Sequence, residues 1–593
     1  MKNVNINING MTFEADANDT ILEAAKKNGI IIPSLCYLKD VHEGGYCRVC
    51  VVEVDGEKNL RTSCNTKVKE GMVVKTNTPK VKQARKLVYE LLLSNHPKDC
   101  LSCARNQHCE LQELGEIIQI DEDRFTGVLS NTSIDDSNPS IVRDASKCVL
   151  CRRCITMCNE VQGVGAINIQ NRGFDSYIGS AETLDLKDTN CVLCGQCTTV
   201  CPVNALKEKD SIEDVIAALN DPNKRVVAQT APAIRAALGE EFGFEPGTLV
   251  TGKMVAALKL MGFDDVFDTN FAADLTIIEE GTEFLGRVKK ALTKEKAVLP
   301  MITSCSPGWI KYIEHTFPDL LGHLSTCKSP HMMLGALVKS YYAEQINEKP
   351  ENIYVVSIMP CTAKKFECTR EEMPNDVDAV LTTRELARMI KDFGIDFKNL
   401  KDSSFDPILG LSSGAADIFA NTGGVMEAAI RTVYEVITGR EVPFKDLHIK
   451  PIMGLEGIKE GSLLIEKALK EWKILEGVEV KVAVASGLKN AKVLLDQIQN
   501  GTSPYHFIEI MACPGGCISG GGQPRMTTKE VKQKRLEAIY KEDEGKVLRK
   551  SHDNEEVKKL YSDFLGEPNG HKSHELLHTH YVPRGRFNEL LER

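Results

Sequence analysis

Cysteine spacing constrains this chain more than any other feature. Of its 593 residues 21 are cysteine, and most of them fall in short runs with C-x2-C pairs. The N-terminal residues alternate polar and apolar side chains and contain no apolar core of signal-peptide length. Clustered C-x2-C pairs without a secretion signal favour metal ligation in a reducing compartment over disulfides. We therefore expect a cytoplasmic metal-binding protein.

Two of the cysteine runs have the same internal spacing, C-x2-C-x2-C-x3-C, at residues 148–158 and 191–201. This repeat is typical of proteins that bind two [4Fe–4S] clusters, in which the fourth cysteine of each run ligates the cluster of the other run. The predicted ligand sets are Cys148, Cys151, Cys154 and Cys201 for one cluster, and Cys158, Cys191, Cys194 and Cys197 for the other. We expect residues 141–209 to form a two-cluster ferredoxin domain.

Residues 1–78 contain a looser cysteine set with the spacing C-x10-C-x2-C-x13-C, formed by Cys36, Cys47, Cys50 and Cys64. A tight pair with one distant cysteine on each side is the arrangement of plant-type [2Fe–2S] ferredoxins, although the first gap is longer here. A strand over residues 4–9 and a helix over residues 21–28, capped by Thr20, fit a β-grasp domain. A zinc site is the alternative.

Residues 79–140 combine one histidine with three cysteines, in the order His96-x3-Cys100-x2-Cys103-x5-Cys109. One imidazole and three thiolates can hold a [4Fe–4S] cluster, and we expect a [4Fe–4S] domain with this ligand set after a helix over residues 81–93. A zinc knuckle with the same four ligands is the alternative. Together these domains predict one [2Fe–2S] and three [4Fe–4S] clusters.

From residue 210 onward the pattern changes to α/β. Apolar runs predict strands over residues 225–228, 275–278, 298–302, 353–358, 480–485 and 507–510, and helices are expected over 253–261, 335–347 and 424–438. Three cysteine segments lie at or just beyond predicted strand ends, over residues 303–309, 359–367 and 509–517. Because α/β proteins commonly place ligands there, we expect the segments to converge on one buried iron site.

The C-terminal segments contain MPCxxKxxE from Met359 and ExMACxxGCxxGGGxP from Glu509. With the ferredoxin modules, these motifs resemble those of large multi-cluster [FeFe]-hydrogenases over nearly the whole chain. The resemblance implies a two-lobed catalytic domain over residues 210–593, with a C-terminal extension. It also implies reversible proton reduction and H2 oxidation at an H-cluster. That group is a [4Fe–4S] cubane joined to a diiron unit with CO, cyanide and azadithiolate ligands.

Site roles follow from the same resemblance. Cys361, Cys513 and Cys517 would ligate the cubane, with Cys517 as the bridge to the diiron unit. Lys364 would bind a cyanide, and Pro232, Met359 and Met511 would contact the diiron unit. The matching proton path would consist of Arg287, Glu283, Ser325, Glu280 and Cys305. Glu280 and Glu283 lie three residues apart, so a helix would place them on one face.

One position departs from the family pattern. Members usually have two adjacent cysteines, the first a proton relay and the second the fourth cubane ligand, whereas this chain has Cys305-Ser306. Three interpretations are open: Ser306 ligates through oxygen, Cys305 takes over ligation, or the nearby Cys327 supplies the thiolate. We favour Cys305 as the relay and Ser306 at the ligand position, and we treat Cys368 as structural.

Electrons would come from a ferredoxin or from NAD(P)-linked flavoprotein subunits, and maturation proteins would supply the diiron unit. The alternatives are a hydrogenase-like sensory or iron–sulfur assembly protein, and a respiratory or molybdenum-enzyme electron-transfer subunit. The latter leaves Cys361, Cys513 and Cys517 unexplained. The net charge of −10 argues against nucleic-acid binding. No run of about 18 apolar residues predicts a membrane span.

Two further motifs are interpreted as coincidental. Gly247-x4-Gly252-Lys253 resembles a phosphate-binding loop, but Met254 stands where Ser or Thr would hold magnesium. We expect a turn that enters a core helix. The stretch from His574 to His578 matches the zinc motif HExxH, and we expect it to be a chance match on a terminal helix.

Overall fold

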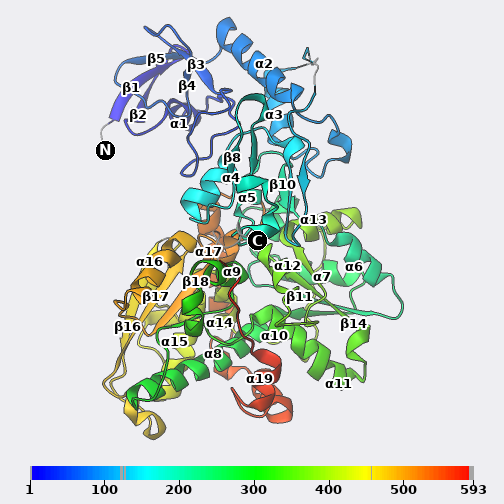
Figure 1. Ribbon diagram of the computed structural model, residues 1–593, viewed down its shortest axis with the longest axis vertical. Coiled ribbons are helices and arrows are strands. Elements are labelled where there is room, and N and C mark those ends of the chain that lie inside the picture. Colours follow the sequence, from blue (N-terminus) through cyan, green and yellow to red (C-terminus); the bar gives the residue numbers. More distant parts are fainter. Residues whose placement is uncertain (1–2, 121–123, 126–127, 456, 526, 586–593) are drawn as a thin grey trace.

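The computed structural model describes residues 3–120, 124–125, 128–455, 457–525 and 527–585. The outermost residues of the expected first and last domains lie outside this range. Figure 1 shows the N-terminal sheet at one end, the ferredoxin-like segment in the middle and a large two-part α/β region at the other end. The chain thus places its cysteine-rich segments in sequence along one long axis.

The N-terminal part is a mixed five-stranded sheet packed on one helix. The strand order is β2-β1-β5-β3-β4. The strands are β1 (Asn3–Ile8), β2 (Met11–Asp16), β3 (Val51–Val54), β4 (Arg61–Thr62) and β5 (Met72–Lys75), and the helix is α1 (Ile21–Lys27). Thr20 caps α1 as predicted, because its side chain accepts the Glu23 N–H while the Glu23 carboxylate accepts the Thr20 N–H.

The middle part consists of short elements around cysteine loops. Its helices are α2 (Pro79–Ser94), α3 (Glu110–Ile118), α4 (Arg153–Thr156) and α5 (Gln196–Thr199). Its strands are β6 (Ile134–Asp135), β7 (Ile141–Asp144), β8 (Asn168–Gln170), β9 (Tyr177–Gly179) and β10 (Leu206–Glu208). The order β10-β7-β6 pairs the start and end of the ferredoxin-like segment, which closes it as one unit.

The α/β region contains two four-stranded sheets. The first is fully parallel, with the order β12 (Asp265–Asp268), β11 (Arg225–Thr230), β14 (Ile353–Met359) and β15 (Ala379–Thr382). The second has the order β13 (Met301–Ile302), β18 (Phe507–Met511), β17 (Glu479–Ser486) and β16 (Ile458–Leu464), and only β16 is antiparallel. Each sheet has its own hydrophobic core, which confirms the two-lobed α/β expectation.

Helices cover both sheets. Those of this region are α6 (Ile212–Leu219), α7 (Thr251–Leu260), α8 (Thr269–Leu292), α9 (Pro307–Thr316), α10 (Pro330–Leu337), α11 (Ala343–Ile346), α12 (Ala363–Glu367), α13 (Thr383–Asp392), α14 (Gly414–Asp417), α15 (Gly424–Thr438), α16 (Leu488–Gln499), α17 (Lys529–Gly545), α18 (Glu555–Leu560) and α19 (His571–Leu577). The long helix α8 contacts α10 from the first lobe and α15 from the second, so it joins the two lobes.

One predicted strand is wrong. Residues 275–278 lie inside α8, which begins after the capping residue Asp268 and has buried side chains on several faces. A short apolar run in a helix buried on several sides has no helical periodicity to distinguish it from a buried strand. The other predicted strands and helices are present, although the strand expected over residues 298–302 is only β13. The sequence motif at Gly247 precedes α7 as expected, and the Lys253 ammonium donates to the Leu400 carbonyl.

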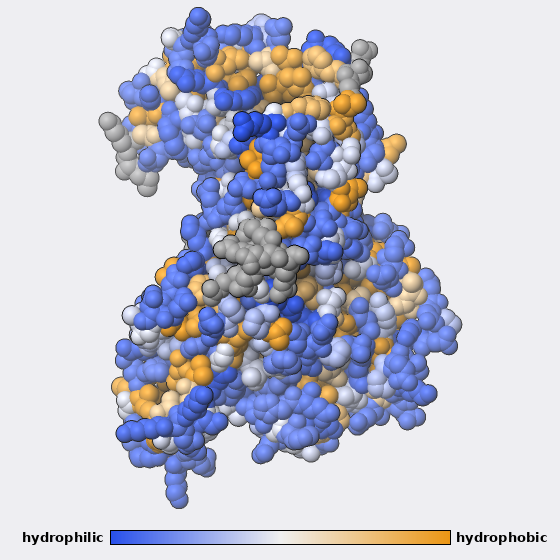
Figure 2. Space-filling model, viewed as in Figure 1, coloured by the Kyte–Doolittle hydropathy of each residue, from blue (hydrophilic) through white to orange (hydrophobic). Residues whose placement is uncertain are grey.

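The surface in view is mostly hydrophilic, and Figure 2 shows hydrophobic residues gathered over the N-terminal end. In the N-terminal part of the chain, the exposed apolar side chains include Leu87 and Leu91 on α2, Leu101 and Ile117. Among the described residues, no helix combines the length and hydrophobicity that a membrane span requires.

Candidate metal centre

The three cysteine segments of the α/β region meet at one cavity of about 90 Å³. Cys305 follows β13, Cys361 follows β14 and Cys513 follows β18, so each segment leaves the carboxyl end of a parallel strand. The side chains that were predicted to hold or contact a cofactor and that line this cavity are Pro232, Cys305, Ser306, Met359, Cys361, Lys364, Met511, Cys513 and Cys517. The structure therefore brings this whole predicted set together.

The thiols in this cavity are poorly suited to carry charge by themselves. Burial raises the pKa of the Cys517 thiol to about 12, with a further contribution from Cys361. Burial likewise raises the pKa of Cys361 and Cys513. Thiolates become stable in such a place only when a cation or metal cluster binds them. Three convergent buried thiols in one cavity therefore fit an iron–sulfur cluster.

The Cys305-Ser306 pair lies at the edge of this cavity. The Ser306 hydroxyl accepts a hydrogen bond from the Ala512 N–H at 3.4 Å, next to Cys513. Both Cys305 and Ser306 line the cavity, whereas Cys327 does not. Among the three interpretations for the fourth cubane ligand, the placement supports Ser306 or Cys305 rather than Cys327.

Lys364 points its ammonium into the same region. Its Nζ atom donates to the Cys305 carbonyl at 3.2 Å and to Glu367 Oε2 at 2.7 Å. Although burial raises the pKa of Glu367, the charges of Lys364 and His331 lower it to about 2. An ionised partner holds the lysine side chain in place, so the ammonium can serve as a fixed donor to an anion in the cavity.

The five residues predicted to carry protons lie near one another, and hydrogen bonds join three of them. Arg287 Nη2 donates to Glu283 Oε1 at 2.6 Å, and Ser325 Oγ donates to Glu283 Oε2 at 3.0 Å. Glu280 lies on the same face of α8, and Ser325 and the Ser304 backbone lie close enough to its carboxyl group to favour the ionised form. Burial and the charge of Glu283 raise the pKa of Glu280 to about 8. The last member, Cys305, is half-buried, lies near Glu280 and lines the cavity.

The ferredoxin-like cysteines surround two separate cavities. Cys148, Cys151, Cys154 and Cys201 line one, and Cys158, Cys191, Cys194 and Cys197 line the other. This grouping matches the predicted exchange of the fourth ligand between runs. Cys194 also lines the cavity at Cys361 and Cys513. The second ferredoxin-like site therefore adjoins the candidate metal centre.

The two N-terminal cysteine sets also come together. In the [2Fe–2S]-type loop, Cys36 contacts Cys47 and Cys64, and Cys50 contacts Cys64. In the next segment Cys109 lies near Cys103, and Tyr89 lies near both Cys100 and Cys109. The buried Nδ1 atom of His96 has no hydrogen-bond partner among the described residues. A buried histidine nitrogen without a partner, four residues before Cys100, is compatible with the predicted ligand role.

Sequence reasoning missed several cavity residues. Thr269, His331 and Phe419 line the cavity, and His331 Nε2 lies 2.6 Å from Glu367 Oε2. These residues lie outside the recognised motifs, and their spacing has no periodic signal, so only the folded arrangement identifies them.

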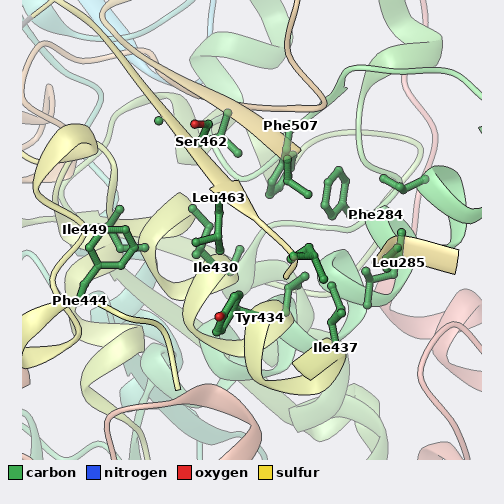
Figure 3. Close-up of a pocket in the computed structure, with 18 of the residues that line it drawn as sticks. Phe284, Leu285, Ile430, Tyr434, Ile437, Phe444, Ile449, Ser462, Leu463 and Phe507 are labelled. Carbon is green, nitrogen blue, oxygen red and sulfur yellow. The ribbon is translucent and has the colours of Figure 1, made fainter. Parts of the chain in front are cut away.

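Another cavity, of about 50 Å³, lies away from the cysteines, between α8, α15 and the sheet of the second lobe (Figure 3). The rings of Phe284 and Phe507 stack there at 5.0 Å. Its lining is almost entirely apolar, and the lining residues that the structure describes include no cysteine, histidine or carboxylate. It is not a candidate metal centre.

The family comparison agrees with the site. Residues 224–521 match the model described as iron only hydrogenase large subunit, C-terminal domain. The chain is 50% identical over 598 aligned residues to the NADP-reducing hydrogenase subunit HndD of Solidesulfovibrio fructosivorans, covering 99% of this chain and 100% of that protein. The chain belongs to the iron-only hydrogenase family.

Other matches cover the remaining parts of this hydrogenase. Residues 529–584 match the iron hydrogenase small subunit, residues 1–79 a 2Fe-2S iron-sulfur cluster binding domain, residues 85–124 the NADH-ubiquinone oxidoreductase-G iron-sulfur binding region, and residues 147–205 a 4Fe-4S dicluster domain. These matches confirm the predicted fold class and the order of cluster-binding regions. The exact number of clusters stays a prediction.

Relatives and solved structures extend the comparison. Iron hydrogenase 1 of Clostridium pasteurianum is 39% identical, over 97% of this chain and 99% of that protein. A variant of apo [FeFe]-hydrogenase HydA1 from Chlamydomonas reinhardtii has a TM-score of 0.57 and 44% identity, over 63% of this chain and 99% of that one. The cytosolic Fe-S cluster assembly factor narfl of Xenopus tropicalis is 31% identical, over 62% of this chain and 76% of that protein.

Proposed function

We propose that this iron-only hydrogenase interconverts protons and H2 at an H-cluster bound in the cavity at the strand ends. The observation that carries the proposal is the convergence of Cys361, Cys513 and Cys517 with Lys364 in one buried cavity. When bound, the H-cluster supplies the redox-active iron at which protons and electrons combine. Cys361, Cys513 and Cys517 would be its thiolate ligands, and Ser306 would occupy the fourth position.

The other cavity residues would hold the group and exclude water. Met359 and Met511 are buried at the ends of β14 and β18, where their polarisable side chains fit an irregular apolar surface. Pro232 follows β11 and closes another wall. Lys364 would bind an anionic ligand such as cyanide, because its ammonium is already held by Glu367.

Protons would move along Arg287, Glu283, Ser325, Glu280 and Cys305. The hydrogen bond from Ser325 to Glu283, and the position of Ser325 beside Glu280, support this order. A Glu280 pKa of about 8 suits a group that must gain and lose a proton near neutral pH. Cys305 would deliver the proton inside the cavity, because it lies near Glu280 and lines the cavity.

Electrons would reach the cavity through the accessory clusters. The site of Cys191, Cys194 and Cys197 adjoins the cavity through Cys194. Arg153, between Cys151 and Cys154, donates to the Cys36 carbonyl at 3.3 Å. On the other side, the Cys109 thiol lies 4.0 Å from the carbonyl of Pro202, which follows Cys201. The [2Fe–2S] site and the site of His96 would thus both feed the Cys148–Cys201 site, which gives two possible entry points.

The electron partner would be a flavoprotein subunit of an NAD(P)-linked complex. The similarity to a subunit of an NADP-reducing hydrogenase supports this choice over a free ferredoxin. The exposed Leu87 and Leu91 on α2, and Leu101 beside Cys100, offer an apolar surface at the outer cluster sites. Co-purification of a flavoprotein in fixed ratio from native cells would support the complex. A hydrogenase that purifies alone and exchanges electrons with ferredoxin would contradict it.

The second candidate function is iron–sulfur assembly without H2 turnover, which the similarity to narfl favours. The hydrogen-bonded residues Arg287, Glu283 and Ser325, with Glu280 and Cys305 beside them, argue for catalysis, since assembly needs no proton path. The test is H2 production by matured protein with reduced methyl viologen. We expect activity in the native chain and in the control Cys368→Ala, and its loss in Cys517→Ala. No H2 from protein with a complete diiron unit would favour assembly.

A further inference from the structure

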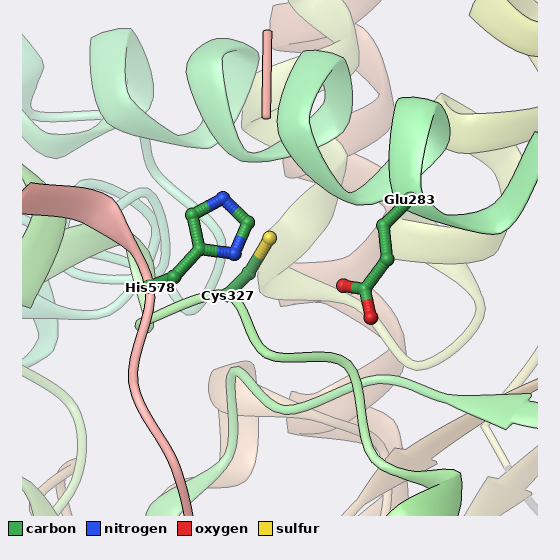
Figure 4. A group of neighbouring side chains, drawn as sticks. All are labelled: Glu283, Cys327 and His578. Atoms are coloured by element: carbon green, nitrogen blue, oxygen red, sulfur yellow. The ribbon is translucent and has the colours of Figure 1, made fainter. Parts of the chain in front are cut away.

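A side-chain cluster outside the cavity contains three different metal-ligand types. Glu283 from α8, Cys327 from the loop before α10 and His578 from the C-terminal segment each offer one ligand atom, and these atoms lie within 4.8 Å of one another. Figure 4 shows the three side chains pointing toward a shared space, with a ring nitrogen of His578 next to the Cys327 sulfur. Cys327 and His578 are joined by an antiparallel backbone bridge, which fixes their spacing.

The motif HExxH does not form a zinc site of its own here. The helix α19 ends at Leu577 and His578 has an extended backbone, so the two histidines lack the helical geometry of the HExxH zinc motif, although their rings lie 4.2 Å apart. His574 is exposed and His578 is 7% exposed. Only the second histidine of the motif therefore takes part in the cluster.

The orientation of His578 resembles that of a metal ligand. Its Nε2 atom lies 3.1 Å from Glu279 Oε2. Although burial raises the pKa of Glu279, hydrogen bonds from His578, Tyr561 and the Asn569 backbone lower it below its ordinary value. The ionised carboxylate of Glu279 accepts a hydrogen bond from Nε2 of His578, so the ring proton lies on Nε2 and the lone pair on Nδ1. Many zinc-binding histidines are oriented by a carboxylate in this way.

The hydroxyl of Thr326 marks the space that an ion would enter. It lies 2.8 Å from His578 Nδ1 and 3.2 Å from Glu283 Oε2. Three carboxyl groups, Glu279, Glu280 and Glu283, act on the Cys327 thiol electrostatically, and Arg287 pairs with Glu283. Glu280 is neutral at pH 7 and Arg287 pairs with Glu283, so the carboxylate of Glu279 gives this cluster a net negative charge, which favours a bound cation.

We propose that Glu283, Cys327 and His578 form a binding site for a soft divalent cation such as Zn²⁺, and that the bound ion blocks proton transfer through Glu283. One thiolate, one imidazole and one carboxylate are the ligands that zinc takes, and water or the Thr326 hydroxyl would fill the fourth position. Binding displaces the thiol proton of Cys327 to solvent. The ion would also occupy the carboxylate of Glu283 that otherwise accepts from Ser325. The inhibition of proton transfer by the bound ion rests on the proposed hydrogenase mechanism, whereas the binding of the ion does not.

The binding test uses holoenzyme with its iron–sulfur clusters intact. Protein incubated with Zn²⁺ and then desalted should keep one more zinc per chain than Cys327→Ala or Cys327→Ser, and the zinc absorption edge should show one sulfur ligand. The control His574→Ala changes the exposed ring that lies 4.2 Å from His578 and should keep the zinc. Equal zinc in the native chain and both Cys327 variants would overturn the site.

The activity test separates the site from the block. Bound Zn²⁺ should lower H2 evolution by about tenfold or more, a chelator should restore it, and the Cys327 variants should be insensitive. Equal inhibition of the native chain and the Cys327 variants would contradict the proposal. Full activity of protein that demonstrably holds the zinc would refute the block and the role of Glu283 in proton transfer, while the site itself would stand.

Discussion

The Ser325 hydroxyl lies 3.0 Å from Glu283 Oε2, to which it donates a hydrogen bond. Ser325 also lies beside Glu280, so one hydroxyl is close to two carboxyl groups that lie three residues apart on α8. We therefore expect a proton that moves between the two acids to pass through this hydroxyl.

Replacing Glu283 with glutamine should lower H2 evolution by about 100-fold or more. The glutamine side chain has nearly the same shape as glutamate, but its amide cannot accept and release the proton. Gas production with a reduced viologen measures the effect. The control Thr282→Ala changes an exposed neighbour on α8 and should keep full activity. Both variants should retain the infrared bands of the diiron unit. Activity of Glu283→Gln near that of the native chain would show that protons take another route.

The protonation of Glu280 should be visible as a function of pH. Its pKa of about 8 means that the native chain keeps this acid neutral at pH 7. A carboxylic-acid band should therefore fade as the pH rises through about 8 and be absent in Glu280→Gln. A band already absent at pH 7 would contradict the assignment.

The same pKa has a consequence for stability. The unfolded chain ionises Glu280 near its ordinary value of 4.5, whereas the native chain ionises it near 8. Between these values the unfolded state binds fewer protons, so the contribution of Glu280 to the free energy of unfolding falls as the pH rises. That contribution is fully present below about pH 4.5, and Glu280→Gln should remove this part of the pH dependence.

Ser306→Cys should change the redox potential and the spectrum of the cubane. If Ser306 holds the fourth ligand position, a softer thiolate replaces a hard oxygen donor, and the midpoint potential should rise while the electron paramagnetic resonance signal changes. The control Ser562→Cys adds a thiol at an exposed site on the C-terminal segment and should leave both unchanged. An unaltered signal and potential in Ser306→Cys would rule out Ser306 as a ligand and favour Cys305.

Lys311 should raise the reduction potential of the cluster at Cys191, next to the cavity. Its Nζ atom donates to the Cys191 carbonyl at 2.8 Å from a buried position. Loss of this positive charge in Lys311→Met should lower the potential of the Cys191 cluster by roughly tens of millivolts, since reduction adds negative charge nearby. The Cys148 cluster should not change, and neither should the exposed control Lys492→Met. Equal shifts in both clusters would point to a general structural effect.

The cysteine spacing alone predicted the grouping of the accessory ligands. The repeat at residues 148–201 defines two sets of four, and the structure places these sets around two cavities. The convergence of the three C-terminal segments also followed from their position after strands. These residues come together because the spacing within each run is a local property and because parallel strands end on one edge, while their roles as ligands stay predictions.

Other features required the folded chain or the family pattern. The proton path came from the resemblance, since Glu283 and Ser325 lie 42 residues apart and have no shared local signal. The strand predicted at residues 275–278 failed because tertiary burial of α8 hides its helical period. The contact of Cys327 with His578 joins segments about 250 residues apart, and no sequence pattern connects them.

The most direct measurement of the central claim is the infrared spectrum of matured holoenzyme. Protein with its diiron unit should show carbon monoxide and cyanide bands, and Cys517→Ala should lose them while its accessory clusters keep their signals. The control Cys368→Ala should keep the bands, because its thiol donates to the Lys364 carbonyl and does not line the cavity. Bands that persist in Cys517→Ala, or that are absent from fully matured native protein, would contradict an H-cluster in this cavity.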